Sequence, residues 1–166
     1  MDAIKIIKEH GVVPVQGLKD PDTAPQVAAA LRRGGLPLIE VTMRAEKAMD
    51  CLRAIKSADS QMLAGAGTIL RCEQVDQAKE AGADFVVTPG FNPKVVARCL
   101  ELEMPVVPGC ITPTEIEAGL EMGLTTFKFF PSEPMNGMAT IKQLCGPYGS
   151  IQFIPTAGIN LSNMEE

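Results

Sequence analysis

The chain has 166 residues, of which 46% are hydrophobic and 21% charged, the composition of an ordinary globular protein with a packed core. Its net charge of −5, its lack of Trp and its single Tyr argue against nucleic acid as the main partner. No apolar run approaches the roughly 18 residues that a membrane helix needs. The charged N-terminal residues contain no signal-peptide core, so we expect no membrane partner.

The cysteines and the histidine exclude several kinds of site. The 5 cysteines are scattered, odd in number and form no C-x-x-C pair. This pattern predicts reduced thiols in a cytoplasmic protein and excludes a disulfide framework or a zinc site. The single histidine, His10, argues against a histidine-based metal site or catalytic triad, and we expect it on the surface.

Short apolar segments typical of strands recur every 21 to 26 residues, which is the length of one βα unit. Amphipathic segments such as 23–35, 46–58 and 72–83 lie between them and predict helices. A short glycine-containing motif precedes three of these strands and predicts the end of a helix there. The motifs are GG (34–35), AGA (81–83) and MGL (122–124). The expected strands lie within residues 11–16, 36–42, 62–69, 84–90, 105–111, 126–132 and 151–159.

The predicted fold class is α/β, a (β/α)8 TIM-barrel type with seven strands and six full helices in this chain. The strands are apolar on both faces, as in parallel sheets covered by helices. An open doubly wound sheet is the alternative. We expect one domain over residues 1–166 that lacks the last helix of unit seven and the whole of unit eight, because such a barrel usually takes about 250 residues.

Polar residues at the carboxyl ends of the expected strands are the candidate site, since barrel active sites lie there. Alternation places Glu40 with Leu36 and Leu38 on one face of its strand, and Lys128 with Thr126 and Phe130 on one face of another. If Glu40 and Lys128 both point inward, they meet near the barrel axis. The other candidates are Thr42, Arg44, Thr68, Thr88, Pro89, Thr156 and Gly158.

Lys128 is the residue that points most directly to chemistry. It lies among three phenylalanines in TTFKFFPSE (125–133), where burying a charged ammonium group is costly. Apolar surroundings and the nearby Arg44 favour a neutral, nucleophilic amine that forms a Schiff base with a ketone. Glu40 would move protons. The alternative is a structural Lys128–Glu40 ion pair.

Three further motifs suggest how a substrate would be held. Arg44 is suited to bind a carboxylate with its planar guanidinium, unless it is simply a solvated loop residue. GAGT (65–68) lacks the third glycine of a dinucleotide loop, so its small residues are better explained by close approach of a ligand near Thr68. TAGINLS (156–162) predicts a nascent helix N-terminus that could hold a phosphate or carboxylate, or an ordinary capped helix start.

Several motifs in order along the chain resemble the 2-keto-3-deoxy-6-phosphogluconate (KDPG) aldolases, which often also act as 4-hydroxy-2-oxoglutarate (KHG) aldolases. The resemblance covers residues 4–162. Its most specific combination is IEVTMR (39–44), GAGTIL (65–70) and FKFFPSE (127–133). The remaining motifs are VVPV (12–15), VTPGFNP (87–93), VPGCITPTE (107–115) and GPYGSIQFIPTAGI (146–159).

The resemblance implies a class I aldolase on a (β/α)8 barrel, a homotrimer that needs no metal or other cofactor. The Schiff-base lysine of the family falls on Lys128 and its general acid/base on Glu40. Carboxylate binding falls on Arg44 and Thr68. Pro89 and Phe130 match residues that line the pyruvate pocket, and Thr156 and Gly158 match the loop that helps bind phosphate.

The sequence departs from the family at the phosphate loop. The family usually has two glycines after the PT of strand seven, and here the first is Ala157, whose methyl group would crowd the phosphate. The Gly-Ser loop of the eighth strand is also absent from residues 1–166. Weakened phosphate binding is therefore expected.

These observations predict cleavage of KDPG to pyruvate and glyceraldehyde 3-phosphate. Alternatives within the class are 4-hydroxy-2-oxoglutarate and 2-keto-3-deoxy-6-phosphogalactonate as substrates. An alternative of another class is an inactive truncated barrel that binds pyruvate-like acids. The only partner expected besides a second and third copy is therefore a small 2-keto acid.

Overall fold

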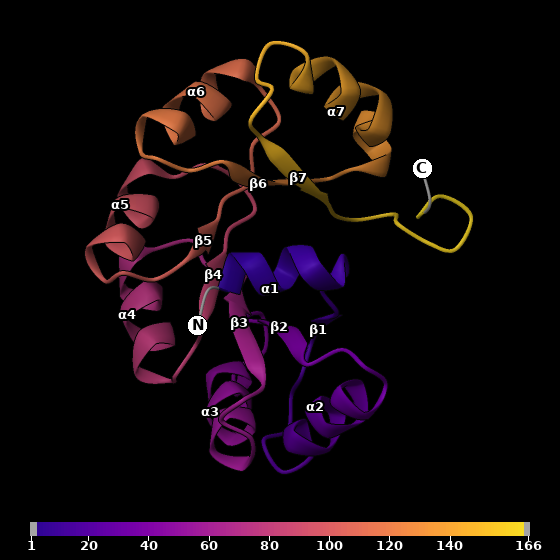
Figure 1. Ribbon diagram of the computed structural model, residues 1–166. Coiled ribbons are helices and arrows are strands. Elements are labelled where there is room, and N and C mark those ends of the chain that lie inside the picture. Colours follow the sequence, from indigo (N-terminus) through magenta and orange to yellow (C-terminus); the bar gives the residue numbers. More distant parts are fainter. Residues whose placement is uncertain (1–2, 165–166) are drawn as a thin grey trace. The chain divides into compact units, whose positions relative to one another are not determined.

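The computed structural model describes residues 3–164, and these fall into two compact units. Unit 1 contains the residues up to Val87 together with Lys94–Val106, and unit 2 contains Thr88–Pro93 together with the chain from Val107 onward. Figure 1 shows helices alternating with strands in both. The single domain expected from the sequence stays a prediction.

Unit 1 is built around a parallel sheet whose strands follow one another in chain order, β1-β2-β3-β4-β5. The register pairs Val15 with Glu40, and Glu40 with Gly65. The sheet ends at β5, where the boundary between the units falls. Its strands are β1 (Val15–Gln16), β2 (Leu38–Thr42), β3 (Leu63–Gly67), β4 (Phe85–Val87) and β5 (Val106–Val107), and its helices are α1 (Ala3–His10), α2 (Ala24–Arg33), α3 (Ala48–Ala58), α4 (Cys72–Glu80) and α5 (Pro93–Glu101).

Unit 2 contains a second parallel pair, β6-β7, in which Lys128 is opposite Ile154. On its other edge β6 meets the segment that follows β5, through a parallel bridge between Gly109 and Lys128. The elements of this unit are α6 (Pro113–Glu121), β6 (Thr126–Phe129), the 3-10 helix η1 (Glu133–Met135), α7 (Gly137–Cys145) and β7 (Gln152–Pro155).

The strand order confirms the TIM-barrel type of α/β fold. In a barrel each parallel strand pairs with the next one along the chain, whereas the order of a doubly wound sheet reverses at its middle. The order β1-β2-β3-β4-β5 contains no reversal. All seven expected strands are present, each within its predicted segment. The helix α1 was not predicted, although Ala3 and Ile7 lie one turn apart and are both buried.

Glycines end three of the helices at the positions that the sequence indicated. Gly35, Gly82 and Gly123 have φ values of +87°, +84° and +81°. Only glycine adopts this left-handed conformation without steric cost, which is why it commonly follows the last turn of a helix. The chain then turns back toward the next strand.

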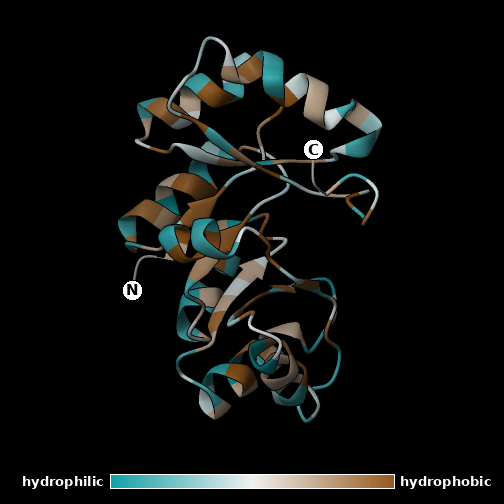
Figure 2. Cartoon of the chain, turned by 45° about the vertical axis from the view of Figure 1, so that its right-hand side comes forward, coloured by the Kyte–Doolittle hydropathy of each residue, from teal (hydrophilic) through white to brown (hydrophobic). Residues whose placement is uncertain are grey.

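Five of the seven described strands are buried on both faces. Every residue of β2, β3, β4, β5 and β6 is buried, as the sequence predicts. The strands β1 and β7 differ, because their residues are exposed or half-buried. The surrounding helices carry hydrophobic and hydrophilic residues on different sides (Figure 2).

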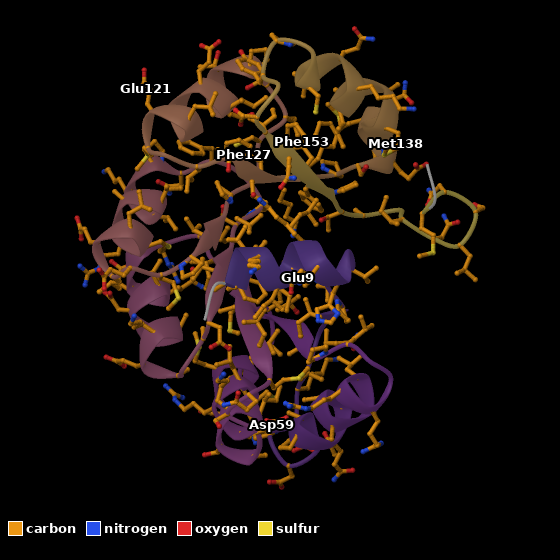
Figure 3. All side chains as sticks on the ribbon, in the orientation of Figure 1. Glu9, Asp59, Glu121, Phe127, Met138 and Phe153 are labelled. Carbon is orange, nitrogen blue, oxygen red and sulfur yellow. The ribbon has the colours of Figure 1, made fainter. Side chains whose placement is uncertain are left out.

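The core of unit 2 centres on aromatic side chains of its two strands. The rings of Phe127 and Phe153 have centroids 6.1 Å apart, and Phe153 meets Phe129 edge to face at 5.8 Å (Figure 3). Such aromatic pairs add stability beyond the area that they bury. Leu144 of α7 and Ile116 of α6 pack on the same cluster, so both helices are fixed to the sheet.

None of the helices within residues 3–164 is both long enough and apolar enough to cross a membrane.

Candidate active site

In unit 1, Glu40 lies in the middle of β2 and is only 4% exposed. Its carboxyl group occupies space left free by β3: a Cβ atom on Gly67 would lie 2.2 Å from Glu40 Oε1. Gly67 therefore leaves room for the Glu40 carboxyl group, whereas Gly65 of the same GAG stretch leaves room for the Phe85 ring, which a Cβ atom there would approach to 2.2 Å.

Arg44 and Thr68 lie just beyond the ends of their strands in the same unit. Arg44 is exposed and follows β2 by two residues, and Thr68 is half-buried and follows β3 directly. The strands β2 and β3 are paired through Thr42 and Gly67, so both residues project from one edge of the sheet. An exposed guanidinium and a hydroxyl at the carboxyl end of parallel strands suit the binding of a small acid.

In unit 2, Lys128 is the third residue of β6 and is 7% exposed. It is the only lysine among the buried residues that the structure describes. Its Nζ atom lies 5.5 Å from the centre of the Phe130 ring, as expected of two side chains on one face of a strand. Phe130 is 38% exposed, so its ring lies between the buried lysine and the solvent-accessible surface of unit 2 only in part.

Pro89 lies in the part of unit 2 that follows β4. A Cβ atom on Gly109 would lie 2.1 Å from the Pro89 carbonyl oxygen, so the two backbones are in direct contact. Gly109 is also bridged to Lys128. The structure therefore brings Pro89, Gly109 and Lys128 together, and Thr88 is held beside them by a hydrogen bond from its hydroxyl to Gly90 O at 2.7 Å.

Thr156 and Gly158 follow β7 and are joined to the segment after β6. Ser132 N donates to Thr156 O at 2.8 Å, and Glu133 N donates to Ala157 O at 3.2 Å. Gly158 has a φ of +84°, and a Cβ atom there would lie 2.3 Å from Glu133 Cγ. In the segment 156–162, where a helix start was predicted, bends at 157–158 precede a turn at 161–164. Asn160 caps this turn: its side chain accepts from Ser162 N at 2.9 Å, and its carbonyl oxygen accepts from Met164 N at 3.0 Å.

The thiol of Cys110, next to the bridge at Gly109, stays protonated near neutral pH. Cys110 adjoins Gly109 and is 1% exposed, and burial raises its pKa from 9.0 to about 12. A thiol is nucleophilic only as the thiolate. Burial therefore disfavours Cys110 as a nucleophile.

The chain is similar to known proteins over nearly its whole length. The profile of the KDPG and KHG aldolase family matches residues 3–166. The 2-dehydro-3-deoxy-phosphogluconate aldolase of Haemophilus influenzae is 44% identical over 163 residues, which are 98% of this chain and 77% of that protein. The chain belongs to the KDPG and KHG aldolase family.

Solved structures of this aldolase family superpose closely on the chain. The 2-keto-3-deoxy-6-phosphogluconate aldolase of Zymomonas mobilis with 3-phosphoglycerate has a TM-score of 0.93 at 32% identity, covering 98% of this chain and 78% of that one. The KDPG aldolase of Legionella pneumophila, with pyruvate captured as a covalent carbinolamine, has a TM-score of 0.89 at 34% identity, covering 92% and 74%. The aldolase fold thus extends over nearly all of this chain.

Two residues of this aldolase chain were missed by sequence reasoning. Glu115 binds the segment next to Lys128, and Glu133 packs on Gly158. The signal for Glu115 was present, because T-P-T-E at 112–115 has the spacing of a helix capping box. Glu133 carried no such signal, since its neighbour is 25 residues away in the sequence, at 158.

Proposed function

We propose that this chain is a class I aldolase, an aldehyde-lyase that cleaves KDPG to pyruvate and glyceraldehyde 3-phosphate through a Schiff base on Lys128. The observation that carries the proposal is a buried lysine, Lys128, in a chain of the KDPG and KHG aldolase family. The carbinolamine in the Legionella relative supports the same chemistry, because a carbinolamine forms when an amine adds to a ketone.

The reaction begins with attack of the Lys128 amine on the C2 ketone. The resulting carbinolamine loses water and becomes an iminium ion, which is an electron sink. Glu40 takes the proton of the C4 hydroxyl through a water molecule as the C3–C4 bond breaks. The aldehyde leaves, the bonding electrons remain in an enamine, and C3 is protonated. Hydrolysis of the iminium releases pyruvate and regenerates the amine.

The remaining site residues bind the substrate in this proposal. Arg44 and Thr68 hold the carboxylate, because a guanidinium offers two parallel donors to it. Pro89 and Phe130 line the pyruvate pocket. The loop of Thr156 and Gly158 approaches the phosphate.

Borohydride reduction in the presence of pyruvate tests the proposal directly. The expected result is an irreversible adduct that peptide mass mapping places on Lys128. The Lys128→Ala variant should form no adduct and should lose at least about a thousandfold in kcat, because it removes the nucleophile. Folded wild-type protein that forms no adduct would leave the inactive pyruvate-binding barrel as the better description.

A second candidate substrate is 4-hydroxy-2-oxoglutarate, which carries no phosphate. The family profile includes KHG aldolases, and Ala157 adds a methyl group to the loop that would approach the phosphate. The test is to measure kcat/KM for both substrates and to divide the value for KDPG by the value for 4-hydroxy-2-oxoglutarate. A ratio near one supports the second substrate, and a large ratio in favour of KDPG excludes it as the main one. The galactonate epimer of KDPG is measured in the same assay.

A homotrimer in the cytoplasm completes the proposal. The trimer follows from the family resemblance, and all 5 cysteines are unpaired thiols, as is usual in a reducing compartment. Sedimentation equilibrium gives the number of copies, and fractionation of cells gives the location.

A further inference from the structure

The backbone of Lys128 is held on one edge by a segment that belongs to no regular element. Lys128 N donates to Pro108 O at 2.9 Å, and Cys110 N donates to Lys128 O at 2.9 Å. The strand β5 ends at Val107, before these residues. The segment Pro108–Thr112 therefore acts as the neighbour of β6 at the lysine, and any movement of it would move Lys128.

Close contact on its other side leaves this segment little freedom to shift. A Cβ atom on Gly109 would meet Pro89 O at 2.1 Å and Gly90 N at 2.8 Å. The segment thus lies between the backbone of Lys128 and the backbone of Pro89. Small displacements here change the placement of both.

Glu115 is the side chain that holds the end of this segment. Its Oε2 atom accepts three hydrogen bonds, from Ile111 N at 2.9 Å, Thr112 N at 3.0 Å and Thr112 Oγ1 at 2.8 Å. Thr112 Oγ1 accepts in turn from Glu115 N at 3.4 Å. Hydrogen bonds to a carboxylate are stronger than neutral ones, and a negative charge is favoured in the first turn of a helix such as α6.

We propose that Glu115 is a positioning residue for the Schiff-base lysine: by fixing Ile111 and Thr112 it holds Pro108–Cys110 against the backbone of Lys128. It touches no reacting atom. The inference rests on the proposed function, since it assigns Lys128 as the nucleophile. It concerns unit 2 alone.

The test compares the rate of adduct formation with pyruvate and borohydride among Glu115 variants. Glu115→Ala removes all the acceptors and should slow adduct formation and kcat together by about tenfold or more, with KM changed less, because a nucleophile displaced by even a fraction of an ångström loses rate steeply. Glu115→Gln keeps an acceptor oxygen in the capping box and should stay within about threefold of the wild type.

Asp84→Ala is the matched control for lost stability. Asp84 accepts from Ala64 N and from Lys56 Nζ, both at 2.8 Å, and lies in unit 1 at the start of β4. Each variant is assayed at a temperature well below its own midpoint of thermal unfolding. Asp84→Ala should keep the wild-type rate although it is destabilised. Should Glu115→Ala fail to fold, Thr112→Ala removes the two hydrogen bonds between its hydroxyl and Glu115 but keeps those from the Ile111 and Thr112 backbone, and it should give a smaller loss of the same kind.

The outcomes separate the inference from the proposed function. No adduct in the wild type would remove the proposed function itself. A wild-type adduct formed equally fast in Glu115→Ala would overturn only the positioning role. An equal loss in Asp84→Ala, or no recovery in Glu115→Gln, would overturn it too, because the effect would then follow stability or charge and not the anchoring of the segment.

Discussion

At the scale of single residues, the hydroxyl of Thr126 is a local weakness. Thr126 is 6% exposed, and its Oγ1 atom is the buried side-chain oxygen that has no hydrogen-bond partner within residues 3–164. A buried hydroxyl without a partner costs free energy, and valine has the same shape without the polar atom. We expect Thr126→Val to raise the free energy of unfolding by about 1 kcal/mol, measured by urea denaturation.

Thr88→Val is the control for this prediction. Thr88 is also buried, at 1% exposed, but its hydroxyl donates to Gly90 O at 2.7 Å. Its replacement should lower the free energy of unfolding by about 1 to 2 kcal/mol. Opposite signs for the two threonines are expected, and a loss in Thr126→Val would show that its hydroxyl is satisfied.

Ala157 adopts a backbone conformation that favours glycine. Its φ is +77°, which costs a residue with a Cβ atom about 1 kcal/mol. We expect Ala157→Gly to leave stability equal or raise it by up to about 1 kcal/mol, and to lower the KM for KDPG relative to 4-hydroxy-2-oxoglutarate. The measurements are urea denaturation and the two KM values. Gly158→Ala should do the reverse, because its Cβ atom would lie 2.3 Å from Glu133 Cγ.

At the scale of elements, Lys56 and Asp84 join α3 to the starts of β3 and β4. Lys56 Nζ donates to Asp84 Oδ2 and to Met62 O, both at 2.8 Å, and the pair is mostly shielded, with side chains 17% and 29% exposed. Removing one partner leaves the other charge without its ion-pair partner in a partly buried position. We expect Asp84→Ala to lower the free energy of unfolding by about 2 to 3 kcal/mol.

An exposed ion pair gives the contrast for that value. Arg53 Nη1 lies 2.7 Å from Asp50 Oδ1, but the two side chains are 48% and 58% exposed. Such pairs contribute little because water screens them. Asp50→Ala should change stability by no more than about 0.5 kcal/mol, and a loss as large as that of Asp84→Ala would contradict the role of burial.

Elements also differ in how far the sequence predicts them. All seven strands were predictable because each is a short apolar segment followed by a turn signal. Helix α1 escaped prediction, since only Ala3 and Ile7 of its eight residues are buried and charged residues interrupt the other apolar ones. The edge strands β1 and β7 are more exposed than their sequences predict, because burial depends on neighbours and not on composition.

At the scale of the whole molecule, buried thiols make stability depend on pH in alkaline solution. Burial raises the pKa of both Cys99 and Cys110 from 9.0 to about 12. Above pH 9 the unfolded chain releases these protons and the folded protein keeps them, so the free energy of unfolding falls as the pH rises from about 9 toward 12. Urea denaturation across this range should show the decline.

The variants Cys99→Ala and Cys110→Ala check the cause of this decline. Each should lower the stability at pH 8 through the loss of packing, and each should flatten the slope above pH 9. A slope unchanged in both variants would assign the decline to other groups. Iodoacetamide at pH 8 should label Cys72 and Cys145, which are half-buried, before Cys99 and Cys110.

The sequence by itself determined the order of helices and strands, the barrel type of fold and the candidates Lys128 and Glu40. These follow from periodicity and from residue type, which depend on neighbours a few positions away. The tertiary structure decided that Gly67 leaves room for Glu40, that Gly109 touches Pro89 and that Glu115 anchors the segment beside Lys128. Such contacts join residues brought together by strand register and loop packing, which no local pattern encodes.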